Sequence, residues 1–183
     1  SDSVIYKGDD NKYYEQVGKS DKEITEEIAF DLPNGWSWCR LKDICSIFTG
    51  ATFKKEETVT TKEGVRILRG GNISPFELRI KDDDIFLTKD KVKEDIILKE
   101  NDILTPAVTS LENIGKMVRV NSDMPNTTVG GFVFIIRLYL KNQWLSKYIL
   151  YLLSSPFMID FMKSITNKSG PVSYTHLRAH ETD

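Results

Sequence analysis

A short polar turn, Arg69-Gly70-Gly71-Asn72, carries side chains whose chemistry suits contact with nucleic-acid bases. Arginine makes bidentate hydrogen bonds to guanine in the major groove of DNA, and asparagine makes them to adenine. Two consecutive glycines let the backbone turn sharply and approach another surface closely. A plain strand-end turn with a solvated arginine explains the same tetrapeptide equally well.

Three further stretches have a similar character, since they are rich in hydroxyl, amide and glycine groups and poor in carboxylates. They are Thr105–Ser110, Leu111–Gly115 and Asn126–Gly131. A rigid sheet that holds such loops out to solvent favours recognition over catalysis.

Known catalytic motifs are missing from the chain. The glycines at 70 and 71 lack the G-x-x-x-x-G-K-[ST] frame that cradles phosphates. No glycine-rich turn of the S-adenosylmethionine type and no Asn/Asp-Pro-Pro-aromatic tetrapeptide occurs. Asp10-Asn11-Lys12 has the form of a nuclease motif, but it lies in an acidic leader. We therefore expect a chain without catalysis of its own.

Two sets of residues raise the question of a metal. Asp82-Asp83-Asp84 is predicted to be a solvated turn, because consecutive carboxylates point in different directions and no matching ligand cluster follows. His176 and His180 have the i, i+4 spacing of a zinc pair on a helix. However, Val172–Asp183 resembles translated sequencing-adapter read-through, so we expect this tail to be non-native and assign no metal site to it.

The hydrophobic pattern predicts a sheet followed by helices. A strand at Trp36–Arg40, with both tryptophans in the core, is expected to lead into a two-turn helix over Leu41–Phe48. Two amphipathic helices are expected at Asn142–Leu153 and from Pro156 onward. The other predicted strands are Val65–Leu68, Ile85–Leu87, Ile103–Leu104, Lys116–Val120 and Phe132–Leu140.

Charge divides the chain unevenly. Residues 1–33 hold 4 basic and 9 acidic residues, whereas residues 34–171 hold 20 basic and 16 acidic residues. We therefore predict an acidic linker or arm over 1–31, a folded domain over 32–171 and a non-native tail over 172–183. The basic surplus of the domain permits contact with phosphates but does not by itself indicate nucleic acid.

The two cysteines and the hydropathy bear on location. Cys39 and Cys45 form neither a C-x-x-C pair nor a disulfide framework, so we expect reduced, buried thiols in the cytoplasm. No run approaches the roughly 18–20 apolar residues of a membrane span, and no secretory signal is visible. The first residue is serine, so we expect a fragment or a processed chain. Because 172–183 resembles read-through, we expect the natural protein to continue past about Pro171.

Taken together, several motifs resemble the target-recognition domain of the specificity (S) subunits of type I restriction-modification systems. The resemblance runs over roughly residues 4–170, and its specificity lies in the order and spacing of the motifs. They are Leu32–Leu41 with Ile44, Thr49–Thr52, Ile67–Ile73, Glu100–Leu104, Asn113–Lys116, Asn126–Gly131 and Tyr151–Pro156.

This resemblance implies an α+β fold, with a twisted, mostly antiparallel sheet or partial barrel and C-terminal helices. It implies a module that reads one half of a split target in double-stranded DNA. The implied partners are adenine-N6 methyltransferase subunits and ATP-driven restriction subunits. S-adenosylmethionine, ATP and Mg²⁺ would belong to those partners, with no cofactor in this chain.

Candidate contacts follow from residue type. Phosphate contacts are expected to supply affinity, and side chains on loops after strands are expected to read bases. The candidates for phosphate are Lys54, Lys55, Arg66, Lys116, Lys163 and Lys168. The candidates for bases are Arg69, Asn72, Thr109, Ser110, Asn113, Thr127 and Thr128, with close backbone approach at Gly70, Gly71, Gly130 and Gly131.

Two alternatives remain open at this point. One is the specificity part of a fused restriction-methylation enzyme. The other is a β-rich module that binds carbohydrate or protein, with Trp36 and Trp38 as its stacking platform.

Overall fold

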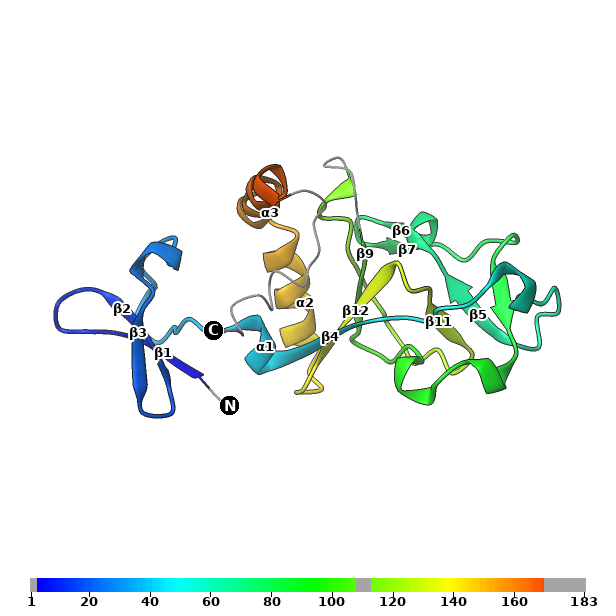
Figure 1. Cartoon of the computed structure of the whole chain (residues 1–183), viewed down its shortest axis with the longest axis horizontal. Coiled ribbons are helices and arrows are strands. Elements are labelled where there is room, and N and C mark those ends of the chain that lie inside the picture. The colour runs from blue at the N-terminus through cyan, green and yellow to red at the C-terminus, as the bar shows by residue number, and fades with distance from the viewer. Residues whose placement is uncertain (1–2, 108–112, 170–183) are drawn as a thin grey trace. The chain divides into compact units, whose positions relative to one another are not determined.

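The computed structural model of this chain describes residues 3–107 and 113–169, with only the backbone described for 165–169. Its residues separate into two compact units, Ser1–Cys45 and Ser46–Asp183, which we describe one at a time. Figure 1 shows the course of the chain through both.

The first unit contains a three-stranded antiparallel sheet of β1 (Ser3–Lys7), β2 (Tyr13–Val17) and β3 (Ser20–Glu23). Residues 3–23 of the predicted acidic linker or arm over 1–31 therefore form a small sheet. Tyr6 lies opposite Tyr14 across β1 and β2, and their rings stack with centroids 5.7 Å apart. Such cross-strand pairs stabilise strands that lack an apolar alternation in sequence.

A partly buried ion pair lies within the same unit. Two guanidinium nitrogens of Arg40 donate to the Glu15 carboxylate, the shorter bond measuring 2.6 Å, and a third donates to Glu27. The Arg40 hydrogen bonds hold the pKa of the Glu15 carboxyl below its usual range, although burial opposes them.

The tryptophan segment differs from its prediction. Residues 36–40 form no strand, Trp36 is 58% exposed, and the Trp38 ring packs against Phe30 with centroids 5.1 Å apart. The two rings thus have different surroundings, which does not favour a paired stacking platform. Cys39 is exposed and Cys45 is buried, so the burial prediction holds for Cys45 alone.

The predicted two-turn helix is a single turn. Helix α1 (Leu41–Ile44) ends where strand β4 (Cys45–Thr49) begins. The apolar spacing fits a helix equally well, but Ile47 and Phe48 suit a strand, and β4 joins the edge of a sheet where its backbone groups are paired.

The second unit is built on two larger sheets and a hairpin. One sheet has the order β10-β9-β12-β4, the other β11-β5-β8, and β6 pairs with β7. An isolated parallel bridge between Ala51 and Gly130 connects the continuation of β4 to the end of β11. The remaining strands are β5 (Val65–Leu68), β6 (Ile73–Ser74), β7 (Glu77–Leu78), β8 (Ile85–Leu87), β9 (Ile103–Pro106), β10 (Val118–Arg119), β11 (Thr127–Val129) and β12 (Val133–Leu138).

The core lies around β9 and β12, which pair antiparallel. Ile103, Leu104, Ile135 and Ile136 have no exposed surface, and Arg137 is the one residue of β12 that is not fully buried. This confirms the predicted strand covered on both faces for Val133–Leu138. The prediction was wrong at its ends, because Phe132, Tyr139 and Leu140 lie outside β12 and are exposed.

Two helices follow the last strand, as predicted. Asn142 caps α2 (Gln143–Leu153) by accepting hydrogen bonds from the backbone nitrogens of Trp144 and Leu145. Helix α3 (Pro156–Ser169) begins with proline at its first position. The predicted α+β class with mostly antiparallel strands and C-terminal helices is confirmed, and the described strands form separate sheets rather than a closed barrel. None of the helices in the described part has the length and apolarity that crossing a membrane requires.

Candidate nucleic-acid interface

Loops from distant parts of the sequence meet at one edge of the second unit. Strands β5 and β11 are parallel, so their carboxyl ends, Leu68 and Val129, lie at the same edge. The Gly130 nitrogen donates to the Leu68 carbonyl at 2.9 Å. The turn that begins at Arg69 and the turn that begins at Gly130 are therefore neighbours.

The end of β9 reaches the same place. Pro106 pairs with Val133 at the start of β12, and the Ala107 nitrogen donates to the Phe132 carbonyl at 2.8 Å. A Cβ atom placed on Gly70 would lie 3.3 Å from the Pro106 Cβ. The Arg69 turn therefore packs directly against the end of β9.

A fourth segment completes this edge. The Ala51 nitrogen donates to the Val129 carbonyl at 2.8 Å, and a Cβ atom on Gly131 would lie 3.1 Å from the Thr52 hydroxyl. We call the resulting surface the loop edge, and Figure 1 shows the strands that end there. It consists of Thr52, Arg69–Gly71, Ala107 and Gly130–Phe132.

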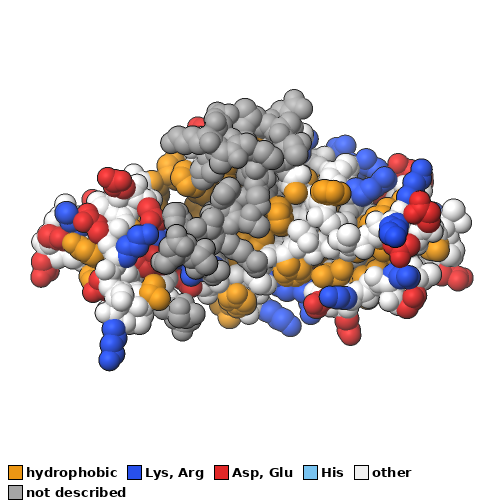
Figure 2. Space-filling model, viewed as in Figure 1, with side chains coloured by type: hydrophobic (Ala, Val, Ile, Leu, Met, Phe, Trp, Pro, Cys, Tyr) orange, Lys and Arg blue, Asp and Glu red, His pale blue; other side chains and the backbone are white. Residues whose placement is uncertain are grey.

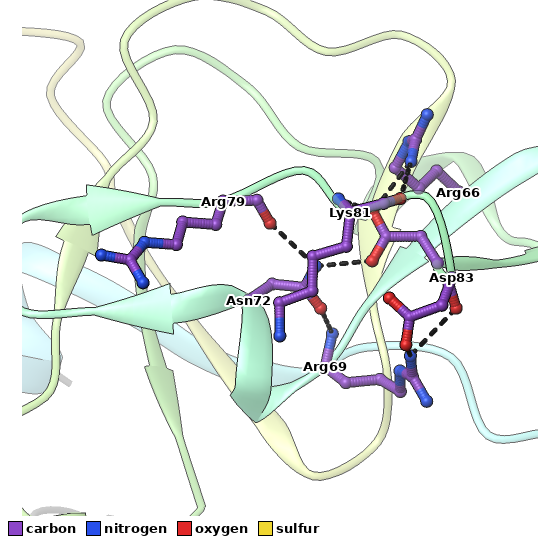
Figure 3. A network of polar contacts seen from close by, with 7 residues as sticks. Arg66, Arg69, Asn72, Arg79, Lys81 and Asp83 are labelled. Atoms are coloured by element: carbon purple, nitrogen blue, oxygen red, sulfur yellow. Dashed lines mark hydrogen bonds and ion pairs between the residues drawn. The ribbon is translucent and has the colours of Figure 1, made fainter.

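Asn72 does not contribute to this surface. It is 1% exposed, its side-chain oxygen accepts from the Arg69 nitrogen at 2.7 Å, and its side-chain nitrogen donates to the Arg79 carbonyl and to Asp84. Figure 3 shows these bonds converging on the amide. The prediction that Asn72 contacts a base is therefore wrong, because both ends of its amide already have partners that fix the turn.

The Arg66 side chain also has its partners within the protein. Its guanidinium donates to Asp84 at 2.8 Å and lies over the Phe86 ring, 4.8 Å from the centroid. The side chain of Asp84 has no exposed surface, so this is a buried pair rather than a solvated turn. Arg66 is thus a poor phosphate contact, and the prediction of Asp84 as a solvated residue is wrong.

Hydrogen bonding controls the ionisation of Asp84. Burial alone raises the pKa of its carboxyl, but donation from the Lys81 nitrogen, Asn72 and Arg66 outweighs burial and holds the pKa below its usual value. The charged form is therefore the one that the fold stabilises.

Stability at low pH follows from this shift. Because the folded pKa of Asp84 lies below the ordinary value of 3.8, its stabilisation is complete above that value and is lost as the pH falls through the folded pKa. We expect urea unfolding to show a decline in stability below about pH 4, and Asp84→Asn to flatten that decline. An acid decline of equal slope in both proteins would contradict this assignment.

Two predicted hydroxyl contacts are buried. Thr127 is 8% exposed and Thr128 is fully buried, with its hydroxyl donating to the Ile96 carbonyl. Both lie within β11 rather than on a loop, so the prediction that they contact bases is wrong. Three further candidates, Thr109, Ser110 and the side chain of Lys168, lie outside the described residues.

The remaining candidates are accessible to different degrees. The Arg69 side chain is 47% exposed and is held by the Asp83 carbonyl at 3.1 Å, with the Asp83 carboxylate 3.6 Å away. Lys54 and Lys55 are exposed, Lys163 is half-buried on α3, and half-buried Lys116 donates to Asn113. Arg69, Gly70, Gly71, Gly130 and Gly131 are the candidates that the structure brings together.

Two cations near the turn did not figure among the predicted contacts. The ammonium of exposed Lys81 lies 3.4 Å from where a Cβ on Gly71 would stand, and Arg79 pairs with Glu77 on the β6–β7 hairpin. The sequence feature that could have predicted them is the spacing of two cations around one apolar residue in Arg79-Ile80-Lys81. Figure 2 shows basic and acidic side chains interspersed on the visible face rather than a continuous basic stripe.

No group of three metal-ligating side chains occurs among the residues that the structure describes. This concerns the aspartates at 82–84 in particular, because the carboxylate of Asp84 binds Arg66 and Asn72. Both oxygens of the Asp84 carboxylate therefore already accept hydrogen bonds from protein groups.

The chain was compared with known proteins of established function. The chain is 36% identical over 104 residues to the specificity subunit of the type I restriction enzyme EcoAI of Escherichia coli. Over these residues the chain is similar to a type I specificity subunit. The match covers 55% of this chain and 17% of that subunit, so the chain spans under a fifth of the relative's length. The resemblance inferred from the motifs is confirmed, although no protein-family profile matches the chain.

One solved structure from the type I restriction-modification system shares the fold. A chain from a structural study of complex assembly and conformational transition in the type I restriction-modification system superposes with a TM-score of 0.55 at 16% identity. It covers 81% of this chain and 33% of that one. The HsdS subunit from Thermoanaerobacter tengcongensis gives a TM-score of 0.49 at 14% identity, over 84% of this chain and 42% of that subunit.

Proposed function

We propose that this chain is a DNA target-recognition module of a type I specificity subunit and reads one half of a bipartite target. The observation that carries the proposal is the loop edge, where exposed Arg69 and four glycines from two sequence segments, 69–71 and 130–131, meet at the ends of buried strands. The relation to the EcoAI specificity subunit supports it.

Affinity and specificity would come from different residues. Lys54, Lys55 and Lys81 are exposed cations of the second unit and would bind phosphates. Arg69 would enter the major groove and pair with a guanine edge. It must first release Asp83, which costs little because exposed ion pairs contribute only about 0.2–1 kcal/mol.

The reaction itself would belong to other polypeptides. In this proposal the chain binds no cofactor and performs no catalysis, and adenine-N6 methyltransferase subunits flip and methylate the target base. Restriction subunits would use ATP and Mg²⁺. Mapping N6-methyladenine in cells with and without the intact gene tests this part, and an unchanged methylation pattern would contradict it.

Binding selection tests the module directly. The purified 183-residue chain is incubated with duplexes that contain a randomised stretch, and the bound fraction is sequenced. The proposal predicts enrichment of one short motif. A bound pool that stays random after repeated rounds would contradict it.

Arg69→Ala should weaken binding to the selected motif by about 1–3 kcal/mol and relax the preference at one G·C pair. Arg79→Ala is the matched control, because its guanidinium points away from Arg69 in Figure 3 and is 57% exposed. It should weaken binding slightly and equally on all sequences. An equal loss on all sequences for Arg69→Ala would make that residue a phosphate contact instead.

A further inference from the structure

Phe132 stands out among the side chains of the loop edge. This residue is 85% exposed, the largest exposed fraction among the large hydrophobic residues of the described part of the chain. Strand β12 begins at the next residue, Val133. Removing an apolar ring from water is favourable, so a partner that covers Phe132 would gain from the contact.

The backbone presents this ring at the tip of a tight turn. The Val133 nitrogen donates to the Gly130 carbonyl at 3.0 Å, which closes a four-residue turn with Phe132 at its third position. The Phe132 carbonyl accepts from Ala107, so the end of β9 holds the turn in place. The ring therefore projects from a fixed backbone.

The surroundings of the ring favour one kind of partner. Gly131 precedes Phe132 in the turn, the Ala107 nitrogen donates to the Phe132 carbonyl, and Pro106, which packs against Gly70, pairs with the next residue, Val133. Arg69 and Lys81 are cations of the turn at 69–72, which meets the same edge. A protein partner would gain a single exposed ring, because the neighbouring turn residues Gly131 and Ala107 offer little apolar side chain. A step between stacked base pairs accepts one flat ring, and phosphates flank it on both sides.

We propose that Phe132 is an apolar wedge that inserts between two base pairs of the target duplex. This inference rests on the proposed function. It adds a residue whose binding depends on how easily a DNA base step unstacks, rather than on the hydrogen-bonding groups of the bases. Inserting phenylalanine at a base step unstacks and kinks DNA. Pyrimidine–purine steps unstack most readily, so the selected motif should contain a TA or CA/TG step at the position that faces Phe132.

The test uses the full 183-residue chain and duplexes of the selected motif with 2-aminopurine placed at successive positions. Binding of the wild-type chain should raise 2-aminopurine fluorescence at one step, because the base there loses its stacking partner. Phe132→Ala should abolish that increase and raise the Kd roughly tenfold or more. A duplex that carries a mismatch at the same step, and is already unstacked, should narrow the difference between the two proteins.

Tyr139→Ala is the matched control. Tyr139 is 65% exposed at the other end of β12, so it removes an exposed aromatic ring away from the loop edge. It should leave both the Kd and the fluorescence increase unchanged. Both variants should keep the wild-type thermal midpoint, since both side chains project into solvent.

The outcomes separate the two proposals. If the wild-type chain shows a sequence preference but Phe132→Ala retains the Kd or the fluorescence increase, the wedge is wrong and the recognition module stands. If the wild-type chain binds every duplex alike, the proposed function fails, and the wedge fails with it.

Discussion

Replacing Asp84 with alanine should lower the free energy of unfolding by about 3–5 kcal/mol, because the change strands a charge and two donors inside the protein. Arg66, whose side chain is 20% exposed, loses its ion-pair partner. The Asn72 amide and the Lys81 nitrogen lose an acceptor at 2.6 Å and 2.9 Å. The Arg69 turn is built on these bonds, so DNA binding should weaken as well.

Asp83→Ala provides the control for this experiment. The Asp83 side chain is 79% exposed and its ion pair with Arg69 is long, so the substitution should change stability by less than about 0.5 kcal/mol. Urea unfolding followed by tryptophan fluorescence measures both variants. Equal stability of the Asp84→Ala and Asp83→Ala proteins would show that the network around Asn72 does not support the fold.

Gly50→Ala should destabilise the protein by about 2–4 kcal/mol, through overpacking and the loss of a backbone hydrogen bond. A Cβ atom on Gly50 would stand 1.8 Å from the Val129 carbonyl oxygen, a contact that only a backbone shift could relieve. That oxygen also accepts the hydrogen bond from Ala51. The shift would separate β4 from β11 and distort the loop edge.

Gly130→Ala is the comparison variant, at the other side of the same bridge. The nearest atom to its Cβ position is 3.7 Å away, which is ordinary contact, and its φ is not positive. The substitution should be neutral, or stabilising by about 0.4–1 kcal/mol because alanine restricts the unfolded chain. If Gly50→Ala proved as mild as Gly130→Ala, the close approach at Gly50 would not exist in solution.

Patterns of buried residues predicted the second unit well. The apolar run that became β12, the short strands at 65–68 and 85–87, and both C-terminal helices follow from periodicity and from Pro156. The sheet of the first unit was missed because its strands are mostly polar and depend on cross-strand pairs such as Tyr6 with Tyr14. A pair of this kind is visible only once the register is known.

The candidate site was predicted in part, for a similar reason. Residue type marked Arg69 and its glycines, and the structure places them at an exposed edge. Residue type also made Asn72 a candidate base contact. Its side-chain amide instead donates to the Arg79 carbonyl and the Asp84 carboxylate. Phe132 was taken as part of a buried strand, because the run of apolar residues does not reveal that its first member lies outside the sheet.

The central claim is that the loop edge distinguishes one DNA sequence from another. The most direct measurement compares the Kd of the purified chain for the selected duplex with its Kd for a shuffled duplex, at about 150 mM salt where phosphate contacts alone bind weakly. We expect the selected duplex to bind more than about tenfold more tightly, since each correctly read base pair is worth about 1–3 kcal/mol. Equal Kd values for the two duplexes would contradict the claim.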